Sequence, residues 1–426
     1  MAIEHAILWS NIAFTTLALP TINCAATFLQ RSKGTSLSVH VQGALTTSGA
    51  PSCNPPYDAL SNLLSLISSQ RHRIVFIEVI EPSVRFFDAF QGPAENVSRM
   101  FIQGRTPIQH SDPFSGKLPN VRQITIVCPG PCRLRSLTNL TQVTLHNGPR
   151  GWNIDTFLDF VDGCSSLRSL SVVRYLRFYP GRDSTRTVSL PSLANLRLDN
   201  CDTARILSHL KLQANTSVSI CTNVKYISED FNNIFSCIPS EISRINFLQC
   251  TRSLTIVFDR VHGDFHVSGF NGITLVFLFQ LCGPLTRLDD NWVRRSLEGA
   301  TNVLPFSDIT SLTLVVDGAH VPWDSWLRQS NHISTLDICC PDIQELVMVL
   351  NRMRSGVPLC HYLRNLSINI SHDNSWSHHA NLLKSAIHLR KTWGSAMSCL
   401  TMNVCEWDNI RRLDPTWMEL VRREGL

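Results

Sequence analysis

The chain has 426 residues, of which 43% are hydrophobic and 17% charged, and this composition supplies enough apolar side chains for a folded core and argues against disorder. The formal net charge of +5 comes without a lysine- or arginine-rich run, so we expect no nucleic-acid partner. No apolar stretch reaches the roughly 18 residues of a membrane-spanning helix, so we expect no membrane partner either.

The first 33 residues contain an apolar segment, residues 6–19, of the kind found in a secretory signal. The flank before it holds Glu4 and no lysine or arginine, and four polar residues interrupt the apolar run, so a signal peptide is the less favoured interpretation. Pro20 is expected to end any helix before it, and a short helix over residues 22–30 is expected after it. We therefore interpret residues 1–33 as an N-terminal cap on the structure that follows.

From residue 34 to residue 426 the chain repeats one short pattern: apolar, two variable residues, apolar, one variable residue, apolar. Leu193, Leu196 and Leu198 are one example. In a strand this spacing buries alternate side chains and exposes those between them, and it is the core of a leucine-rich repeat. Five clear copies occupy residues 167–172, 193–198, 309–314, 333–338 and 363–368.

Weaker copies of the pattern begin near residues 71, 97, 121, 140, 215, 242, 270 and 397. From residue 71 to residue 242 successive copies start 19 to 27 residues apart, close to the about 20–29 residues of this repeat class. The full repeat also places Asn or Cys three residues after its last apolar position. Cys201, Asn223, Cys250 and Cys405 hold that position, and the three cysteines are predicted to be buried and unpaired.

Segments with helical spacing lie between the repeat copies. The clearest are residues 152–161, with Gly163 as a stop, and residues 341–353, which begin with a proline in the first turn. Similar candidates are residues 58–68, 202–210, 230–237, 291–299 and 380–393. Strands alternating with helices predict an α/β leucine-rich-repeat solenoid over residues 34–426, with a curved parallel sheet on one face and helices or loops on the other.

Patterns that would indicate other chemistry are weak. Cys128 and Cys132 have three residues between them within a proline-rich turn, and Cys339-Cys340 precede a strand-to-helix turn, so packing is favoured over redox or metal roles. The histidines between residues 372 and 388 lack the spacing of a metal site, and no nucleotide-binding or nucleophile motif occurs. We therefore predict no enzyme activity, no catalytic residues, no metal and no cofactor.

Fifteen cysteines in a long chain, several at core repeat positions, are typical of reduced thiols, and we expect a cytoplasmic or nuclear protein. Five Asn-x-Ser/Thr sequons occur, and those at Asn365 and Asn369 lie in or beside a predicted strand, where chance occurrence is the better interpretation.

Arginines recur at variable positions of the repeat, and we predict that they make the strand face mildly basic and suited to an acidic partner segment. A solvated stripe without any ligand is the equally favoured alternative. The five partner-binding candidates are Arg122, Arg168, Arg197, Arg244 and Arg364.

Two short segments near the N-terminus suggest a family. Leu8-Trp9-Ser10-Asn11-Ile12, and then residues 28–39 with Arg31-Ser32 near their start, resemble the region that follows the F-box in the mushroom-type (basidiomycete) F-box proteins. The resemblance implies a divergent leucine-rich array that acts as the substrate-receptor part of an F-box ubiquitin-ligase subunit. The leucine-proline-proline-glutamate stretch that starts the family's F-box is missing from this sequence.

We therefore expect a protein-recognition module whose protein partner is not identified by the sequence. A ubiquitin-ligase adaptor is expected as a partner only if an F-box is present upstream, and the chain as it stands is expected not to bind one. The alternative is a leucine-rich-repeat scaffold or regulatory protein with no ubiquitin link.

Overall fold

A computed structural model of the chain describes residues 5–14, 19–42, 62, 65–80, 93–104, 118–127, 137–147, 153–174, 185–223, 233–239, 247–259, 264–282, 290–316, 320–340, 343–354, 356–371, 376–395 and 397–405. It divides into two units, Met1–Thr216 and Ser217–Leu426, so the division falls inside the predicted repeat region. The described fold is mixed α/β, with sixteen strands in mostly parallel sheet, eight in each unit. Within the described residues, no helix has both the length and the apolar composition needed to cross a membrane.

The N-terminal segment joins the sheet of the first unit. A 3-10 helix, η2 (Ala6–Trp9), leads into strand β1 (Asn11–Phe14), which pairs in parallel with β2 (Leu37–Gln42). Helix α1 (Leu19–Arg31) connects the two strands and contains Pro20 as its second residue. The short helix expected over residues 22–30 is confirmed as part of α1, which begins one residue before Pro20. The segment before it forms η2 and β1, and Pro20 is tolerated in α1 because the first turn of a helix has no intrahelical use for the N–H that proline lacks.

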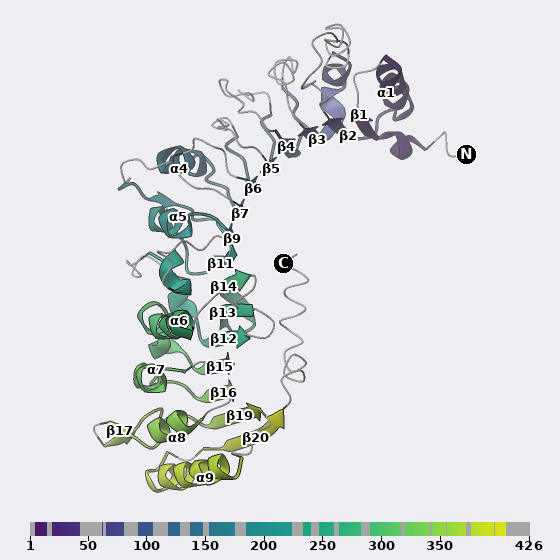
Figure 1. The fold of residues 1–426 in the computed structure, drawn as a ribbon. Helices are drawn as coiled ribbons and strands as arrows, with labels where there is room; N and C mark the ends of the chain where they lie inside the picture. Colours follow the sequence, from purple (N-terminus) through teal and green to yellow (C-terminus); the bar gives the residue numbers. More distant parts are fainter. Residues whose placement is uncertain are drawn as a thin grey trace. The chain divides into compact units, whose positions relative to one another are not determined.

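The first unit continues as a run of parallel strands in chain order, with one strand per repeat (Figure 1). After β2 these are β3 (Ile74–Ile80), β4 (Arg99–Gln103), β5 (Gln123–Val127), β6 (Gln142–His146), β7 (Ser169–Val173) and β9 (Asn195–Asp199). Equivalent repeat positions stand side by side, because Leu170 pairs with Leu196 and Val172 pairs with Leu198. The predicted strand positions of the copies starting at residues 97 to 193 are confirmed.

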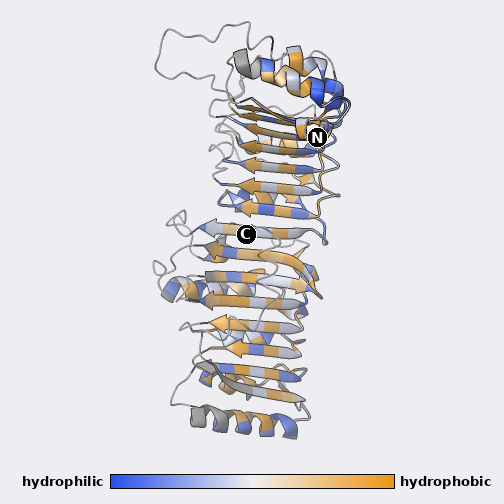
Figure 2. Cartoon of the chain, turned by 90° about the vertical axis from the view of Figure 1, so that its right-hand side faces the viewer, coloured by the Kyte–Doolittle hydropathy of each residue, from blue (hydrophilic) through white to orange (hydrophobic). Residues whose placement is uncertain are grey.

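Alternation along these strands separates a buried set of side chains from an open set, as the alternating colours of Figure 2 illustrate. Leu196 and Leu198 are buried, whereas Arg197 between them is half-buried. The copy near residue 71 was wrong in part: Ile74 is buried as expected, but the next buried positions of β3 are Ile77 and Val79, and Phe76 is not buried. The shift coincides with an irregularity in the pairing of β2 with β3, between Leu37 and Ser38.

Side-chain hydrogen bonds from asparagine and threonine join neighbouring turns that lead into the strands of the first unit. Asn120 and Asn139, each just before the first apolar residue of a copy, donate from Nδ2 to the carbonyls of Glu95 (2.7 Å) and Pro119 (2.8 Å), and Asn96 donates likewise to His72. Thr141 donates from Oγ1 to the Arg122 carbonyl at 3.1 Å. Ser98 of the first sequon donates from Oγ to the Val75 carbonyl of β3 at 3.4 Å, so both polar positions of the sequons at Asn96 and Asn139 satisfy backbone carbonyls of the preceding repeat, which explains them structurally.

The second unit interrupts the parallel order with an antiparallel insertion. The strand order is β11 (Ser217–Asn223), β14 (Thr274–Cys282), β13 (Asp264–Asn271), β12 (Ser253–Asp259), β15 (Ser311–Val316), β16 (Thr335–Cys339), β19 (Asn365–Ser371) and β20 (Cys399–Cys405). Strand β13 runs antiparallel to both of its neighbours, and the other pairings among these eight strands are parallel. A separate short pair, β17 (Met353–Arg354) and β18 (Val357–Pro358), is antiparallel. The insertion was not predicted.

Two weak copies of the pattern were therefore wrong. Ile273, expected in a strand core, is 98% exposed at the turn between β13 and β14, where Gly272 has a φ of 61°. Phe247, expected in a strand, immediately precedes the 3-10 helix η7 (Leu248–Cys250) and is buried. Cys250 consequently lies before a strand, and not after one as predicted.

Helices lie on one side of the strands in each unit (Figure 1). The first unit has α4 (Ile154–Asp162) and α5 (Thr203–His209), both close to prediction, and the short pair β8 (Val188–Ser189) and β10 (Leu210–Lys211). The second unit has η5 (Ile234–Cys237), α6 (Asp290–Val303), α8 (Gln344–Leu350) and α9 (Trp376–Thr392) near predicted segments, and α7 (Trp323–Gln329), which was missed. Most of the predicted helix over residues 58–68 lies outside the described residues.

Candidate functional site

The open face of the first unit carries a regular grid of side chains. The residue between the two buried positions of each strand pairs with its equivalent on the next strand, which forms one central row. From β3 to β9 that row is Glu78, Phe101, Thr125, Thr144, Ser171 and Arg197. Glu78 and Arg197 are the charged members of this part of the row, with uncharged residues between them, and the row continues onto β2 with His40. The strands repeat, but the side chains they present do not.

The end of this face near the N-terminus holds a compact cluster on β2, β3 and β4. His40 contacts Glu78 through Nδ1 and lies edge-on to Phe76, with ring centroids 5.3 Å apart. The Arg99 guanidinium lies 5.6 Å from the centre of the Phe76 ring, within the range of a cation–π contact. The cluster offers an aromatic ring, a cation and an ion pair on neighbouring strands.

The other end of the same face holds a second cluster, on β6 and β9 and in the turn after β7. Arg197 and Asp199 approach to 3.7 Å between Nη2 and Oδ2. Burial lowers the pKa of His146, the nearby Arg174 and Arg197 guanidinium groups lower it further, and Asp199 opposes them. His146 is therefore held in its neutral form, which can accept a hydrogen bond at one ring nitrogen and donate at the other.

The structure does not bring the predicted arginines onto one row. Arg122 and Arg168 are exposed just before β5 and β7, where the Arg122 carbonyl and the Arg168 N–H both bond to the Thr141 backbone between them. Arg197 lies inside β9 on the open face. Arg364 is exposed just before β19 in the second unit, and Arg244 lies outside the described residues.

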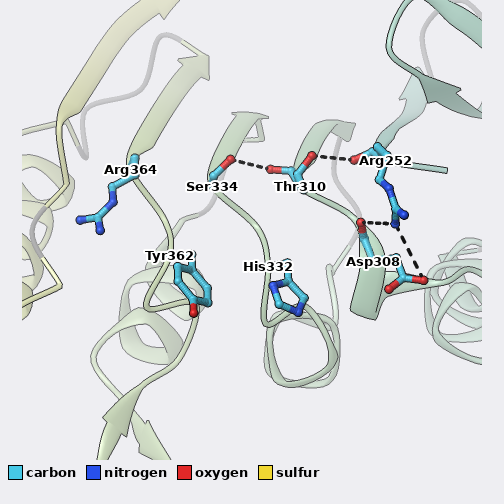
Figure 3. A pocket seen from close by; sticks show the side chains of 7 residues that line it. All are labelled: Arg252, Asp308, Thr310, His332, Ser334, Tyr362 and Arg364. Atoms are coloured by element: carbon cyan, nitrogen blue, oxygen red, sulfur yellow. Dashed lines mark hydrogen bonds and ion pairs between the residues drawn. The ribbon is translucent and has the colours of Figure 1, made fainter. Parts of the chain in front are cut away.

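An open hollow of about 550 Å³ lies at the edge of the second unit where four parallel strands begin, and Arg364 lines it (Figure 3). Its walls come from the residues that precede β12, β15, β16 and β19. They are Arg252, Asp308, Thr310, His332, Ser334, Tyr362 and Arg364. Sequence reasoning found only the last of these, because the others belong to turns that the repeat pattern leaves variable.

Histidine, cysteine and acidic side chains are dispersed over the described part of the chain. No group of three or more histidine, cysteine or acidic side chains there is placed to hold a metal ion. Burial raises the pKa of the Cys164, Cys201 and Cys360 thiols to about 12, so these sulfurs stay protonated and poorly nucleophilic. Cys201 and Cys250 are half-buried and not buried as predicted, and the Cys405 side chain is outside the described residues.

The two N-terminal segments that carry the family resemblance contact each other. Trp9 meets Phe28 edge-on with ring centroids 4.8 Å apart, and the Arg31 guanidinium lies 4.7 Å from the centre of the Trp9 ring. Ser32 is buried and accepts a 2.6 Å hydrogen bond from Arg73, whose Nε also donates to the Thr35 carbonyl. These contacts fix η2 and α1 against the first strands.

No protein-family model and no curated protein matches the sequence.

Proposed function

We propose that this chain is a non-enzymatic protein-recognition module of leucine-rich-repeat type, a solenoid that resembles the substrate-receptor part of an F-box ubiquitin-ligase subunit. The observation that carries the proposal is the open face of the first unit, where parallel strands of constant core present a non-repeating set of side chains. A constant core makes the frame rigid, and a variable face makes it selective.

The chemistry of that face suits a protein partner. Binding energy at protein interfaces concentrates in a few aromatic and arginine side chains surrounded by near-neutral contacts. Phe76, Phe101 and Arg99 lie together on β3 and β4, while the threonines and serines of the following strands provide small hydrogen-bonding groups. The His40–Glu78 pair lies beside an aromatic ring and the Arg197–Asp199 pair lies toward the other end of the row, so the face differs along its length and gives the partner a fixed direction.

The proposal is tested by affinity purification from the native cytoplasm with the parent chain and a face variant. The face variant is Phe101→Ala with Thr144→Arg, and the control is Lys211→Ala, an exposed residue of β10 away from the open face. We expect the parent and the control to retain the same discrete partner and the face variant to lose it. Retention of all partners by a folded face variant would refute recognition through this face.

The ubiquitin link is the second part of the proposal. Ile7 and Leu8, next to the Trp9 segment, are 73% and 57% exposed, so this end of the first unit presents apolar side chains against which an upstream F-box element would pack. We expect a pull-down of residues 1–426 with the ligase adaptor to be negative, and to become positive when an F-box encoded upstream is restored. Adaptor binding by residues 1–426 alone would contradict a capping role for the N-terminal segment. No binding with the F-box restored would favour a scaffold without a ubiquitin link.

A further inference from the structure

We propose that the partner contacts the open face of the first unit through an extended, uncharged peptide segment that lies across strands β5, β6 and β7. The inference rests on the proposed function and deepens it, because it names the kind of segment that the same face binds. It depends on three features of these strands: the lack of charge at their open positions, the chemistry of each row across them, and hydrogen-bonding groups left available for a ligand.

The three strands present nine side chains on the open face, and none of the nine is an acid, a lysine or an arginine. Each strand contributes three, because alternate residues of a strand share a face. Strand pairing aligns them in three rows, so that the chemistry is nearly constant along a row and changes from one row to the next. The first row is Gln123, Gln142 and Ser169, the central row is Thr125, Thr144 and Ser171, and the third row is Val127, His146 and Val173.

Charged side chains lie on the strands at either side of this uncharged patch. Strand β4 begins with Arg99, and β9 holds the Arg197–Asp199 pair. His146 belongs to the uncharged set because burial and the nearby guanidinium groups lower its pKa. A partner with a charged residue over the patch would lose hydration without gaining an opposite charge, which is costly. The patch therefore selects against charged residues at its centre.

The amide and hydroxyl groups of the first two rows are available to a ligand. In the part of the chain that the structure describes, the side chains of Gln123, Gln142 and Thr144 form no hydrogen bond, whereas Thr141 just before β6 bonds to a backbone carbonyl. An amide or hydroxyl side chain carries both a donor and an acceptor, as does each peptide unit of a polypeptide backbone. The two rows therefore match a peptide backbone.

The dimensions of the patch match one extended segment. Three strands about 4.8 Å apart and four residue steps of about 3.4 Å give an area of roughly 10 by 14 Å, far below the about 800 Å² per partner of an interface between folded proteins. An extended segment running along the central row has side chains that alternate between its two sides. One set then lies toward the glutamines and the other toward Val127 and Val173. The partner segment is therefore expected to alternate polar and apolar uncharged residues.

The backbone holds the rows in place before binding. Strands β6, β7 and β9 are each followed by a residue with positive φ, at Asn147 (53°), Arg174 (60°) and Asn200 (51°). The N–H groups of Asn147 and Arg174 still donate to the carbonyls of Val173 and Asp199, at 2.9 and 2.8 Å. Because pairing continues past the last open position of these strands, the third row is fixed in register and little order is lost on binding.

The test selects ligands for the full chain from a displayed library of random peptides about nine residues long, which span roughly 30 Å when extended. Peptides that also bind the face variant, Phe101→Ala with Thr144→Arg, are removed first. We expect the enriched peptides to lack charged residues and to alternate polar with apolar residues. Enriched peptides that carry acids or bases at most positions overturn the inference.

Substitutions then identify the groups that bind an enriched peptide. Gln142→Ala and Thr144→Val each remove one neutral hydrogen-bonding group, so each should weaken binding about 2–10-fold and the double variant more. Gln329→Ala, an exposed glutamine of α7, is the matched control and should bind as the parent does. Equal binding by the parent and the double variant overturns the inference.

Backbone methylation tests the extended conformation. Methyl groups on alternate nitrogens of an enriched peptide should abolish binding where they replace the N–H groups that face the strands, and should have little effect one residue along. A pattern that repeats every three or four residues indicates a bound helix and overturns the inference. Raising the salt concentration from about 50 mM to about 500 mM should weaken binding less than about twofold, because no charge pair is involved, and a larger loss also overturns it.

Failure of this inference is distinguishable from failure of the proposed function. If affinity purification finds a partner that the face variant loses, but no uncharged peptide is enriched, recognition through the open face stands and the extended segment is wrong. If the face variant retains every partner, the proposed function fails whatever the peptides show.

Discussion

Arg390 of α9 should be essential for the turn that leads into the hollow. Its side chain is fully buried, and its guanidinium donates to the carbonyls of Leu359 at 2.8 Å and Cys360 at 2.6 Å, with a longer contact to Leu350 at 3.4 Å. Cys360 has a φ of 51°, an uncommon conformation for a residue other than glycine. The same turn continues directly to Tyr362 and Arg364.

Arg390→Met removes these donors while nearly keeping the side-chain length. Two short charge-assisted hydrogen bonds contribute about 3–6 kcal/mol, at about 1.5–3 kcal/mol each. Burial also lowers the pKa of Arg390, which reflects the cost of holding a cation away from water, and that cost of a few kcal/mol disappears with the charge. We therefore expect a net loss of about 2–4 kcal/mol in the free energy of unfolding of the second unit.

The measurement is amide hydrogen exchange, which reports on this unit by itself. The Leu363 N–H donates to the Cys360 carbonyl at 2.8 Å and should exchange faster by the factor that corresponds to the lost stability. Lys391→Met, an exposed neighbour on the same helix, is the control. Unchanged exchange at Leu363 in Arg390→Met would refute the anchoring role.

Three further predictions concern the first unit and the thiols. Leu196→Ala should lower the free energy of unfolding by about 2–5 kcal/mol because Leu196 is fully buried, whereas Arg197→Ala should lower it by less than about 1 kcal/mol. Equal shifts in melting temperature for the two variants would contradict the register of β9. Cys201 and Cys360, with thiol pKa values of about 12, should react slowly with an alkylating reagent in the native chain at about pH 8 and rapidly once it is unfolded; fast native reaction would contradict their protonated state. The pKa of His146 is lowered in the folded state, so the unfolded chain binds the proton more readily and stability should fall as pH drops below about 6.5. His146→Gln should remove this part of the loss. An acid dependence of stability that is the same in His146→Gln as in the parent would contradict the prediction.

Most strands of the first unit could be predicted because their pattern is local. Leu170 and Val172 are buried for the same reason as Leu196 and Leu198: a strand alternates its side chains, so apolar residues two apart fall on one face. The misplacement at Phe76 arose where Ile74, Phe76 and Ile77 are all apolar, since the pattern alone cannot decide which of several apolar residues faces the core.

The antiparallel insertion in the second unit could not be read from the same pattern. Ile273 fits the apolar spacing, yet the Gly272 turn folds β14 back on β13 and leaves Ile273 in solvent. Which strand pairs with β14 depends on all the strands that could lie beside it, and the spacing of apolar residues within one strand does not show the choice. The leucine-rich-repeat pattern also describes parallel strands only.

The sequence by itself determined which side chains form the core of most strands, because burial follows from apolar spacing within six residues. The sequence also placed Arg364 at a variable position of the repeat, but it did not show which residues lie beside Arg364 in the folded chain. Only the tertiary structure brought Arg252, His332, Tyr362 and Arg364 to one edge, since they are contributed by turns of successive parallel strands separated by whole repeats. The apolar spacing within a repeat determines which of its side chains are buried. A site formed by several repeats depends instead on the pairing register of their strands and on the side-chain lengths at positions where the pattern allows any residue.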